Sequence, residues 1–229
     1  MRERRKQKTR QDISAVAMAL FAESGFDKVT ILQVAEAAGV SKMTVTNYFA
    51  RKEDLVFDRA EEIIHSLANA VAKRAPGESL LAAVRRDYEE RLVAGDLTLG
   101  PPSATFARMI EDSRVLATRW MEIADLGEQA LAEAIAADAG VVDIQHRIVA
   151  AQLASVHRVL FNESVRRVLA GDPPDQIRRT LAAEARRAFD LLEPSLGTYG
   201  IRSSAEGMPR TGDEPAAGVL SARKGAADP

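Results

Sequence analysis

A glycine between two short helical stretches constrains this chain more than any other feature. From Thr30 to Leu55 the sequence reads TILQVAEAAGVSKMTVTNYFARKEDL, and Gly39 separates the two stretches. A residue without a Cβ atom adopts the left-handed conformation that ends a helix at little cost, so the chain is expected to turn sharply there. Thr30 and Ser41 stand where hydroxyl groups cap the first N–H groups of a helix. This pattern is typical of a helix-turn-helix, whose second helix enters the major groove of DNA.

The second stretch, predicted as a helix over about residues 42–49, has two different faces. Val45 and Phe49 lie four positions apart and are expected to point into a core. The outward face carries hydrogen-bond donors and acceptors and one thioether, in Lys42, Met43, Thr46 and Asn47. Such a mixture is suited to the edges of base pairs in a major groove.

Basic residues are concentrated at the N-terminal end. Residues 1–52 hold ten Lys or Arg and five Asp or Glu, a net charge of +5, whereas the remainder carries a net charge of −7. The opening MRERRKQKTR is consistent with a solvated, disordered arm, which can also lie along phosphates or in a minor groove when DNA is bound. A basic end on an acidic chain favours contact between that end and a polyanion.

The same segment has the ingredients of a secretion signal, a charged region followed by an apolar stretch. Gln11 and Asp12 interrupt this pattern, and the apolar run over residues 15–22 is short. Apolar residues also recur at helical spacing, at Ile13, Val16, Ala17, Leu20 and Phe21. We therefore expect a helix that supports the helix-turn-helix.

The rest of the chain is predicted to be helical, and no stretch shows the sustained alternation of a strand, so the predicted fold class is all-α. Glycines and prolines mark the helix ends. The expected helices cover residues 53–74, 78–93, 103–112, 114–139, 142–170 and 175–192. The composition then shifts to Pro, Gly, Ser and small residues, which is typical of a disordered tail. The predicted organisation is a DNA-binding domain over residues 1–52, a helical domain over 53–193 and a tail over 194–229.

The segments LFAESGFDKVTI and VAEAAGVSKMTVTNYFARKEDL resemble the TetR family of bacterial transcriptional regulators. The resemblance covers roughly a fifth to a quarter of the chain, and it is specific because many positions agree at fixed offsets. One position departs from the pattern, since the family commonly has a large aromatic residue where this chain has Thr46. The resemblance implies a helical effector-binding and dimerisation domain after the DNA-binding domain.

The outward face and the resemblance together assign contacts to double-stranded DNA. Asn47 could pair with adenine, Lys42 could donate to guanine or a phosphate, and Met43 could touch a thymine methyl group. The remaining candidate DNA contacts, chiefly to phosphates, are Thr30, Ser41, Thr44, Thr46, Tyr48 and Lys52. Capping alone is the alternative for Thr30 and Ser41. A solvated helix face is the alternative for the two base-reading candidates.

The resemblance further implies a homodimer and a small-molecule effector, and hence a ligand-responsive regulator, most simply a repressor that is released from a palindromic operator. The dimer would form through the last two helices, although sequence alone allows both apolar stripes to be buried within one monomer. The stripe of the last helix comprises Ile177, Leu181, Ala185, Ala188 and Leu192.

Candidate residues for an effector pocket are the large, adaptable side chains of the middle helices. They are Tyr88, Phe106, Met109, Trp120 and Met121. Ordinary core packing is the simpler interpretation of each one. His146 and His157 could offer hydrogen bonds to a ligand.

The composition argues against catalysis and cofactors. The chain has three histidines and no cysteine, and it has neither a phosphate-binding glycine loop nor a metal-ligand motif, so we expect no catalytic residues, no metal and no cofactor. No apolar run is long enough to cross a bilayer, and we expect a cytoplasmic protein without membrane contact. The alternatives to a regulator are a sequence-indifferent DNA-coating protein and, with less support, an all-α enzyme.

Overall fold

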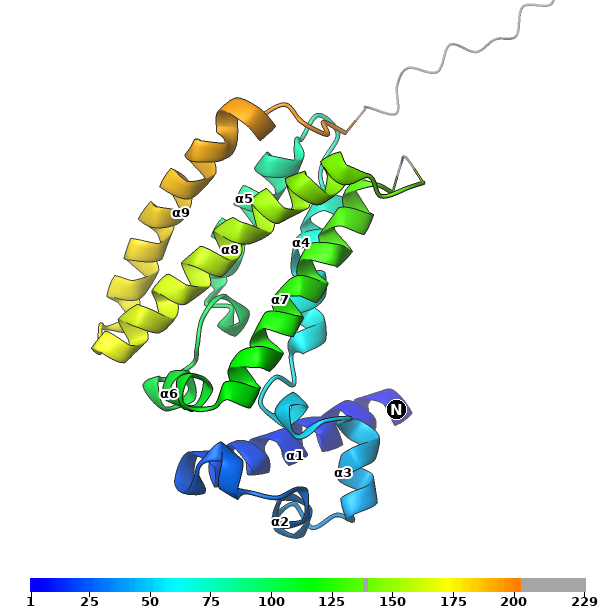
Figure 1. The fold of residues 1–229 in the computed structure, drawn as a ribbon, viewed down its shortest axis with the longest axis vertical. Helices are drawn as coiled ribbons and strands as arrows, with labels where there is room; N and C mark the ends of the chain where they lie inside the picture. Colours follow the sequence, from blue (N-terminus) through cyan, green and yellow to red (C-terminus); the bar gives the residue numbers. More distant parts are fainter. Residues whose placement is uncertain (138–139, 203–229) are drawn as a thin grey trace, which may run out of the picture.

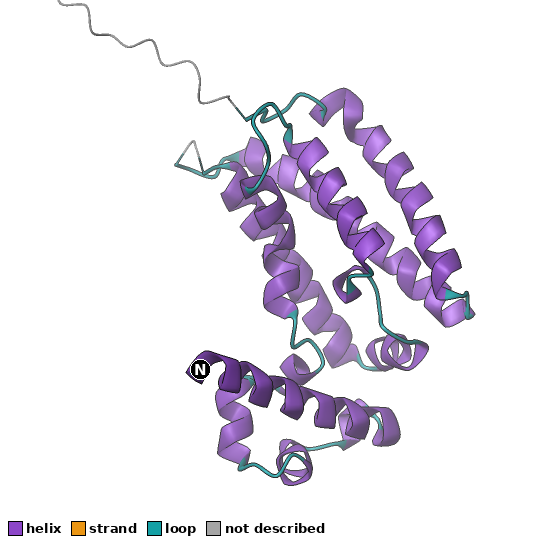
Figure 2. Ribbon diagram, turned by 180° about the vertical axis from the view of Figure 1, so that it is seen from behind, coloured by secondary structure: helices purple, strands orange, loops and turns teal. Residues whose placement is uncertain are grey.

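The computed structural model describes residues 1–137 and 140–202, and this part of the chain is helical, with no strand (Figures 1 and 2). The fold is therefore all-α, as predicted. The α-helices are α1 (Arg2–Ser24), α2 (Ile31–Ala37), α3 (Lys42–Tyr48), α4 (Ala60–Ala72), α5 (Leu80–Ala94), α6 (Ala104–Asp112), α7 (Arg114–Ile135), α8 (Ile144–Ala170) and α9 (Pro174–Leu196). Short 3-10 helices are η1 (Phe26–Lys28), η2 (Lys52–Leu55) and η3 (Leu97–Leu99).

Helices α1, α2 and α3 form a separate lobe, the reading head, below the remaining helices in Figure 1. Thr30 and Gln33 make a capping box at the start of α2, with Thr30 N donating to Gln33 Oε1 at 2.8 Å. Ser41 Oγ accepts the Thr44 N–H at 3.0 Å at the start of α3. Gly39 between them has φ of 66°, the left-handed conformation that the sequence requires there. The predicted helix-turn-helix is thus formed by local interactions.

The other helices form the body of the molecule. Helix α7 packs between α4 and α8, and α9 packs against α5 and α8. Buried apolar side chains fill the space between these helices, including Val84, Leu131, Leu153 and Phe189. A second apolar cluster joins the reading head to the body, because Met109 of α6 and other residues of α6 and α7 pack in the same cluster as the core of the head. Burial of these side chains is the main favourable term in folding.

The chain between the head and the body differs from the sequence prediction. The single helix predicted over residues 53–74 is wrong, because η2 ends at Leu55 and α4 begins only at Ala60. Leu55, Val56 and Phe57 are buried in the cluster that joins the head to the body. The predicted domain boundary at residues 52 and 53 stays a prediction.

The N-terminal arm is also different from the prediction. Helix α1 begins at Arg2, so the basic segment is helical instead of a disordered arm. Arg10 anchors it, since its Nη1 donates to Tyr48 O at 2.7 Å and its guanidinium lies 4.5 Å from the centre of the Phe49 ring. The first turns of α1 therefore lie beside α3 (Figure 1).

The first residues of the predicted tail are ordered parts of the fold. Helix α9 continues to Leu196, whose side chain is buried. Tyr199 O accepts from Leu80 N at 3.2 Å, and Arg202 O accepts from Gly77 N at 2.8 Å. The prediction of a disordered tail is wrong for residues 194–202 for this reason, and its remainder, residues 203–229, lies outside the described residues.

The apolar stripe of α9 is mostly buried within the monomer. Ile177, Leu181 and Ala185 belong to the core of the body, and Ala188 and Leu192 pack against it. The stripe is not available to a second copy, because α9 folds it onto α5 and α8. The intrachain alternative is therefore correct for this stripe. Among the described residues, no helix combines the length and apolar character needed to span a membrane.

Candidate functional site

The outward face of α3 is accessible. The exposed side chains of this helix are those of Lys42, Met43, Thr46 and Asn47. Met43 keeps 73% of its surface exposed, an unusual amount for a large apolar side chain. On the opposite face Val45 and Phe49 are buried. The structure thus brings the predicted base-reading residues together on one exposed surface.

The residues predicted to contact phosphates are placed less uniformly. Thr30 and Ser41 are exposed and cap α2 and α3, so their capping role is confirmed, while their contact with DNA stays a prediction. Thr44 and Tyr48 are half-buried beside the exposed face. Thr46 Oγ1 donates to Met43 O at 3.1 Å. A phosphate that accepted from this hydroxyl would have to replace that bond.

The Lys52 side chain packs inside the reading head. Its Nζ donates to Phe26 O at 2.5 Å and lies 4.2 Å from the centre of the Phe26 ring. Burial lowers the pKa of this ammonium, and the carboxylates of Asp27 and Glu53 partly oppose that change. The side chain joins η2 to η1, so any phosphate contact of Lys52 would be made by an ammonium that already holds the head together.

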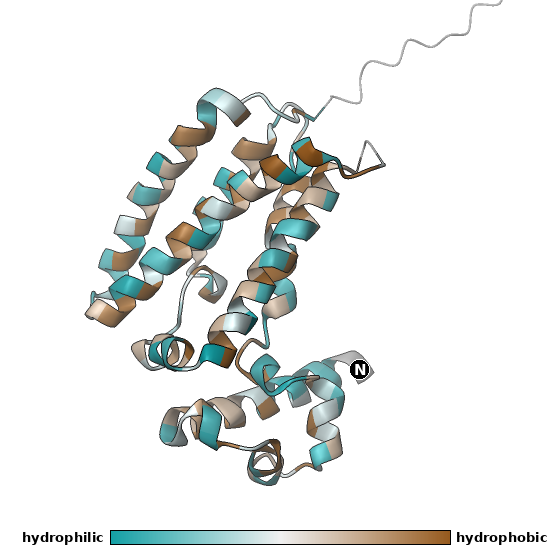
Figure 3. Cartoon of the chain, viewed as in Figure 1, coloured by the Kyte–Doolittle hydropathy of each residue, from teal (hydrophilic) through white to brown (hydrophobic). Residues whose placement is uncertain are grey.

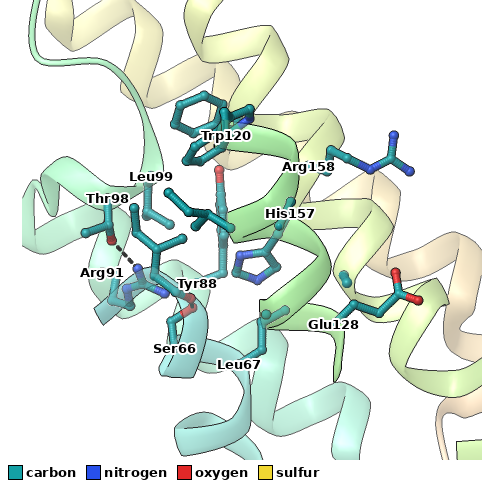
Figure 4. Close-up of a pocket in the computed structure, with 16 residues that line it drawn as sticks. Ser66, Leu67, Tyr88, Arg91, Thr98, Leu99, Trp120, Glu128, His157 and Arg158 are labelled. Atoms are coloured by element: carbon teal, nitrogen blue, oxygen red, sulfur yellow. Dashed lines mark hydrogen bonds between the residues drawn. The ribbon is translucent and has the colours of Figure 1, made fainter. Parts of the chain in front are cut away.

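The body contains an inner cavity of about 80 Å³ between α4, α5, α7 and α8 (Figure 4). Most of its wall is apolar. Two buried polar atoms in its lining, Tyr88 Oη and His157 Nε2, have no hydrogen-bond partner in the described part of the chain. The Tyr88 and His157 rings meet edge to face, with centroids 5.2 Å apart. Burial raises the pKa of Tyr88 to about 12 and lowers that of His157 to about 3, so both groups are neutral at physiological pH.

The arginine in the cavity wall is already neutralised. Arg91 Nε lies 3.0 Å from Asp96 Oδ2 and its Nη1 lies 3.3 Å from Asp87 Oδ2. Its Nη2 donates to the hydroxyl of Thr98. Burial alone would raise the pKa of Asp96, but the hydrogen bonds from Thr98 and Arg91 hold it below its usual range. The guanidinium therefore offers little charge to a ligand.

A second compartment of about 220 Å³ lies between the head and the body. Its wall includes Ser14 and Met18 of α1 together with Phe57 and Phe106. The two compartments share four residues, which are Ile63, Thr98, Trp120 and Phe161. Trp120 stacks on Phe161 with ring centroids 4.1 Å apart, so this aromatic pair stands between the compartments. We call this second space the junction compartment.

The five residues predicted for an effector pocket do not all line these spaces. Tyr88 and Trp120 line the inner cavity, and Phe106 lines the junction compartment. Met109 and Met121 line neither of these two spaces. Met109 is buried in the cluster that joins α6 to the head, and Met121 lies on the outer face of α7 with 66% of its surface exposed.

The two histidines also differ in place. His146 Nδ1 accepts from Asp143 N at 3.2 Å as part of a capping box at the start of α8, whereas His157 lines the inner cavity. The cavity residues that the sequence did not predict include Arg91, Thr98 and Phe161. Helical periodicity was the only sequence feature that could have indicated them. It does not distinguish residues that line a cavity from residues that fill a core.

An ion-pair cluster connects α7 to the reading head, and we call it the Arg119 bridge. Arg119 Nη2 lies 2.9 Å from Asp54 Oδ1 in η2, and Arg119 Nη1 lies 2.9 Å from Glu122 Oε2. Arg51 Nη1 reaches the same Glu122 oxygen at 2.7 Å. Arg119 precedes Trp120 in α7, so the helix that lines both compartments is tied directly to the segment that follows α3.

Residues 13–58 match the profile of the bacterial regulatory proteins of the tetR family, and this range contains the entire helix-turn-helix. The chain carries the DNA-binding domain of the TetR family. It is therefore a helix-turn-helix transcriptional regulator, and the family is not enzymatic. The prediction from the sequence is confirmed at this level.

The similarity to characterised TetR proteins extends beyond the head. The chain is 28% identical over 204 residues to the HTH-type transcriptional regulator TcmR of Streptomyces glaucescens, covering 86% of this chain and 88% of that protein. NalD of Pseudomonas aeruginosa, described as the secondary repressor of the MexAB-OprM multidrug efflux pump, has 20% identity and a TM-score of 0.51 over 80% of this chain and 97% of NalD. GusR of Salmonella enterica has 17% identity and a TM-score of 0.51 over 83% and 96%. The similarities to NalD and GusR show that the fold is shared, and nothing about function.

Tyr88→Phe is expected to raise the thermal stability of this TetR-family regulator in the absence of ligand. The substitution keeps the ring and removes a buried hydroxyl that has no protein partner, a group whose burial costs about 1 kcal/mol or more. Thermal unfolding followed by circular dichroism should show a higher midpoint for this variant. Tyr199→Phe, outside the cavity, should leave the midpoint unchanged. A lower midpoint for Tyr88→Phe would mean that the hydroxyl is already satisfied in the ligand-free protein.

Proposed function

We propose that this regulator is a homodimeric repressor that leaves a palindromic operator when a small molecule binds between its helices. The observation that carries the proposal is the junction compartment, whose wall includes Met18 of the reading head and Trp120 of the body. A ligand in this space touches both lobes, so it can favour one orientation of the head over another. Differential affinity for two such states is what a ligand-dependent release from DNA requires.

In the proposed complex α3 lies in the major groove. Asn47 pairs with adenine, Lys42 donates to guanine or a phosphate, and Met43 contacts a thymine methyl group. Capping residues and hydroxyls around the face, together with the basic first turns of α1, would meet the phosphates. The exposure of this face and the net charge of +5 over residues 1–52 support this arrangement.

The proposed dimer uses the outer faces of α8 and α9, since the stripe of α9 is buried. Hydrophobic and hydrophilic residues are mixed along these helices (Figure 3). Large apolar side chains remain exposed there, with 65% exposure for Ile144, 52% for Ile148, 58% for Val159 and 81% for Leu191. A two-fold pair of heads would read two half-sites and double the contact with DNA.

Val159→Glu is expected to convert the dimer to a monomer. A carboxylate placed on each side of a two-fold interface is desolvated and meets a like charge nearby. Light scattering after gel filtration should give the mass of one chain for this variant and of two chains for the parent protein. Val93→Glu is a matched control, because Val93 is 88% exposed and lies on α5, which is not one of the two helices of the proposed interface. A dimer that survives Val159→Glu unchanged would contradict this interface.

The proposed function as a whole is tested by selecting DNA from a random pool and measuring affinity across a salt series. A repressor of this kind should enrich a near-palindromic sequence and bind it at least about 1000-fold more tightly than random DNA. Affinity that depends on salt but is indifferent to sequence would support a DNA-coating protein and reject the regulator with a defined operator.

A further inference from the structure

We propose that the effector is a neutral, elongated molecule with an aromatic ring and one hydroxyl or carbonyl end, and that it extends from Tyr88 and His157 through to Met18 of the head. This inference rests on the proposed function, because it identifies the chemical class of the ligand for the same space. It follows from the polar atoms and charges of the inner cavity and from the volumes of the two compartments.

The polar end of the ligand is indicated by two buried atoms. Tyr88 Oη and His157 Nε2 line the same inner cavity and have no partner in the described part of the chain. In Figure 4 the Tyr88 ring and the His157 ring lie next to each other in the centre of the cavity. A neutral hydroxyl can donate to one of these atoms and accept from the other, and a carbonyl can accept from the tyrosine. Either group would satisfy atoms that the protein leaves without a partner.

The charges around the inner cavity favour a neutral ligand. Asp87 and Asp96 already balance the guanidinium of Arg91. Glu128 and Arg158, of opposite sign, extend away from Tyr88 and His157 at the rim (Figure 4). Burial keeps the imidazole of His157 uncharged. A carboxylate or an ammonium placed beside Tyr88 and His157 would therefore lose its water without gaining an opposite charge there.

The two volumes determine the length of the ligand. The inner cavity of about 80 Å³ is smaller than the cavity of about 150 Å³ that is known to hold a benzene molecule. A ring fits in the junction compartment of about 220 Å³, where Phe57, Phe106 and Trp120 offer aromatic faces and edges. The ligand must then reach past the stacked rings of Trp120 and Phe161 to place its polar end at Tyr88. Its ring lies against Met18, so the same molecule touches the head.

Four probes with the same ring and the same number of chain carbons separate these requirements. They are 4-phenyl-1-butanol, 4-phenylbutanoate, 4-phenylbutylammonium and butylbenzene, which share one ring and one chain and differ in the polar end. Trp120 is the only tryptophan in the chain, so fluorescence excited at its absorption edge reports from the wall of both compartments. Calorimetry gives the affinity independently. The purified full-length chain is used throughout.

The alcohol is expected to bind at least about tenfold more tightly than each of the other three probes, and to change the emission of Trp120. Tyr88→Phe should remove about fivefold to tenfold of the affinity for the alcohol and leave butylbenzene within about twofold. His157→Leu should act in the same direction. Tyr199→Phe is the matched control, because it removes a phenol hydroxyl outside both compartments, and it should bind all probes as the parent does.

The inference is overturned if none of the probes binds, if the carboxylate or the ammonium binds best, or if Tyr88→Phe weakens the alcohol and butylbenzene equally. The proposed function is tested separately by adding the alcohol to the operator complex. Binding with the expected preference but without loss of operator affinity would contradict ligand-dependent release and leave the ligand class standing. Release of the operator by a charged probe would support ligand-dependent release and contradict the proposed ligand class.

Discussion

Asn47→Ala and Lys42→Ala should each reduce the affinity for the selected operator by about 10-fold to 100-fold, and each should relax the preference at particular base pairs. A bidentate contact with a base contributes about 1 to 3 kcal/mol of discrimination, and a two-fold dimer makes each contact twice. Both side chains are exposed on the outward face of α3, so their loss should leave the fold intact. Fluorescence anisotropy with the operator and with single-base variants of each half-site measures both effects.

The controls for these substitutions carry the same chemical change elsewhere. Asn69→Ala and Lys73→Ala remove an exposed asparagine from α4 and an exposed lysine just after α4, and both should bind the operator as the parent does. Lys52→Ala should instead weaken all sequences about equally, and it should also lower stability, because Lys52 holds η2 to η1. If Asn47→Ala, Lys42→Ala and Lys52→Ala all act alike, the division between base and phosphate contacts is wrong.

Arg119→Ala should lower the free energy of unfolding by about 2 to 3 kcal/mol and reduce the effect of a cavity ligand on DNA binding. Arg119 and Asp54 are mostly buried, with 16% and 15% of their side chains exposed, so removing one partner leaves a poorly solvated carboxylate. The same change releases α7 from the segment that follows α3. Chemical denaturation gives the stability, and the ratio of operator affinities with and without ligand gives the coupling.

A second substitution separates the lost ion pair from general damage to α7. Arg119→Ala combined with Asp54→Asn should recover part of the lost stability, since the unpaired charge is gone, but it should not restore the coupling. Arg166→Ala is the matched control, because Arg166 pairs with Glu163 on the surface of α8 and should cost less than about 0.5 kcal/mol. Full ligand response in the Arg119→Ala variant would show that the Arg119 bridge does not transmit binding to the head.

The sequence predicts the reading head well because its structure depends on neighbouring residues. Thr30 caps with Gln33 three positions later, Ser41 caps Thr44, and Gly39 supplies the left-handed turn between them. Each of these interactions spans only a few positions in the chain. The exposed face of α3 then follows from helical spacing alone.

Long-range packing explains what the sequence does not predict. The turn after η2 depends on Phe57, which is buried in the apolar cluster that joins the head to the body. Lys52 turns inward because Phe26, distant in the chain, presents its carbonyl and ring. An apolar stripe such as that of Ile177 and Leu181 shows that a face is buried, but the same pattern serves for burial within one monomer or between two.

The candidate residues of the effector pocket were also predicted only in part from the sequence. Tyr88 and Trp120 were predicted from size and chemical type, and both line the inner cavity. Met121 is adjacent to Trp120 in the sequence but projects from α7 to the surface. Size and chemical type identify side chains that are suited to a pocket. The helix face on which each side chain lies decides whether it reaches the pocket.

If the reading head and the ligand space form one coupled unit, the fluorescence of Trp120 should respond to DNA bound at the head. Trp120 lines both compartments and lies in the body, while the face proposed to read DNA is on α3. Adding the selected operator, without any ligand, should change the emission of Trp120 and its quenching by acrylamide, and a random duplex should do so much less. Unchanged emission at operator concentrations that saturate binding would show that DNA binding does not alter the surroundings of Trp120. This result would contradict coupling between the reading head and the ligand space.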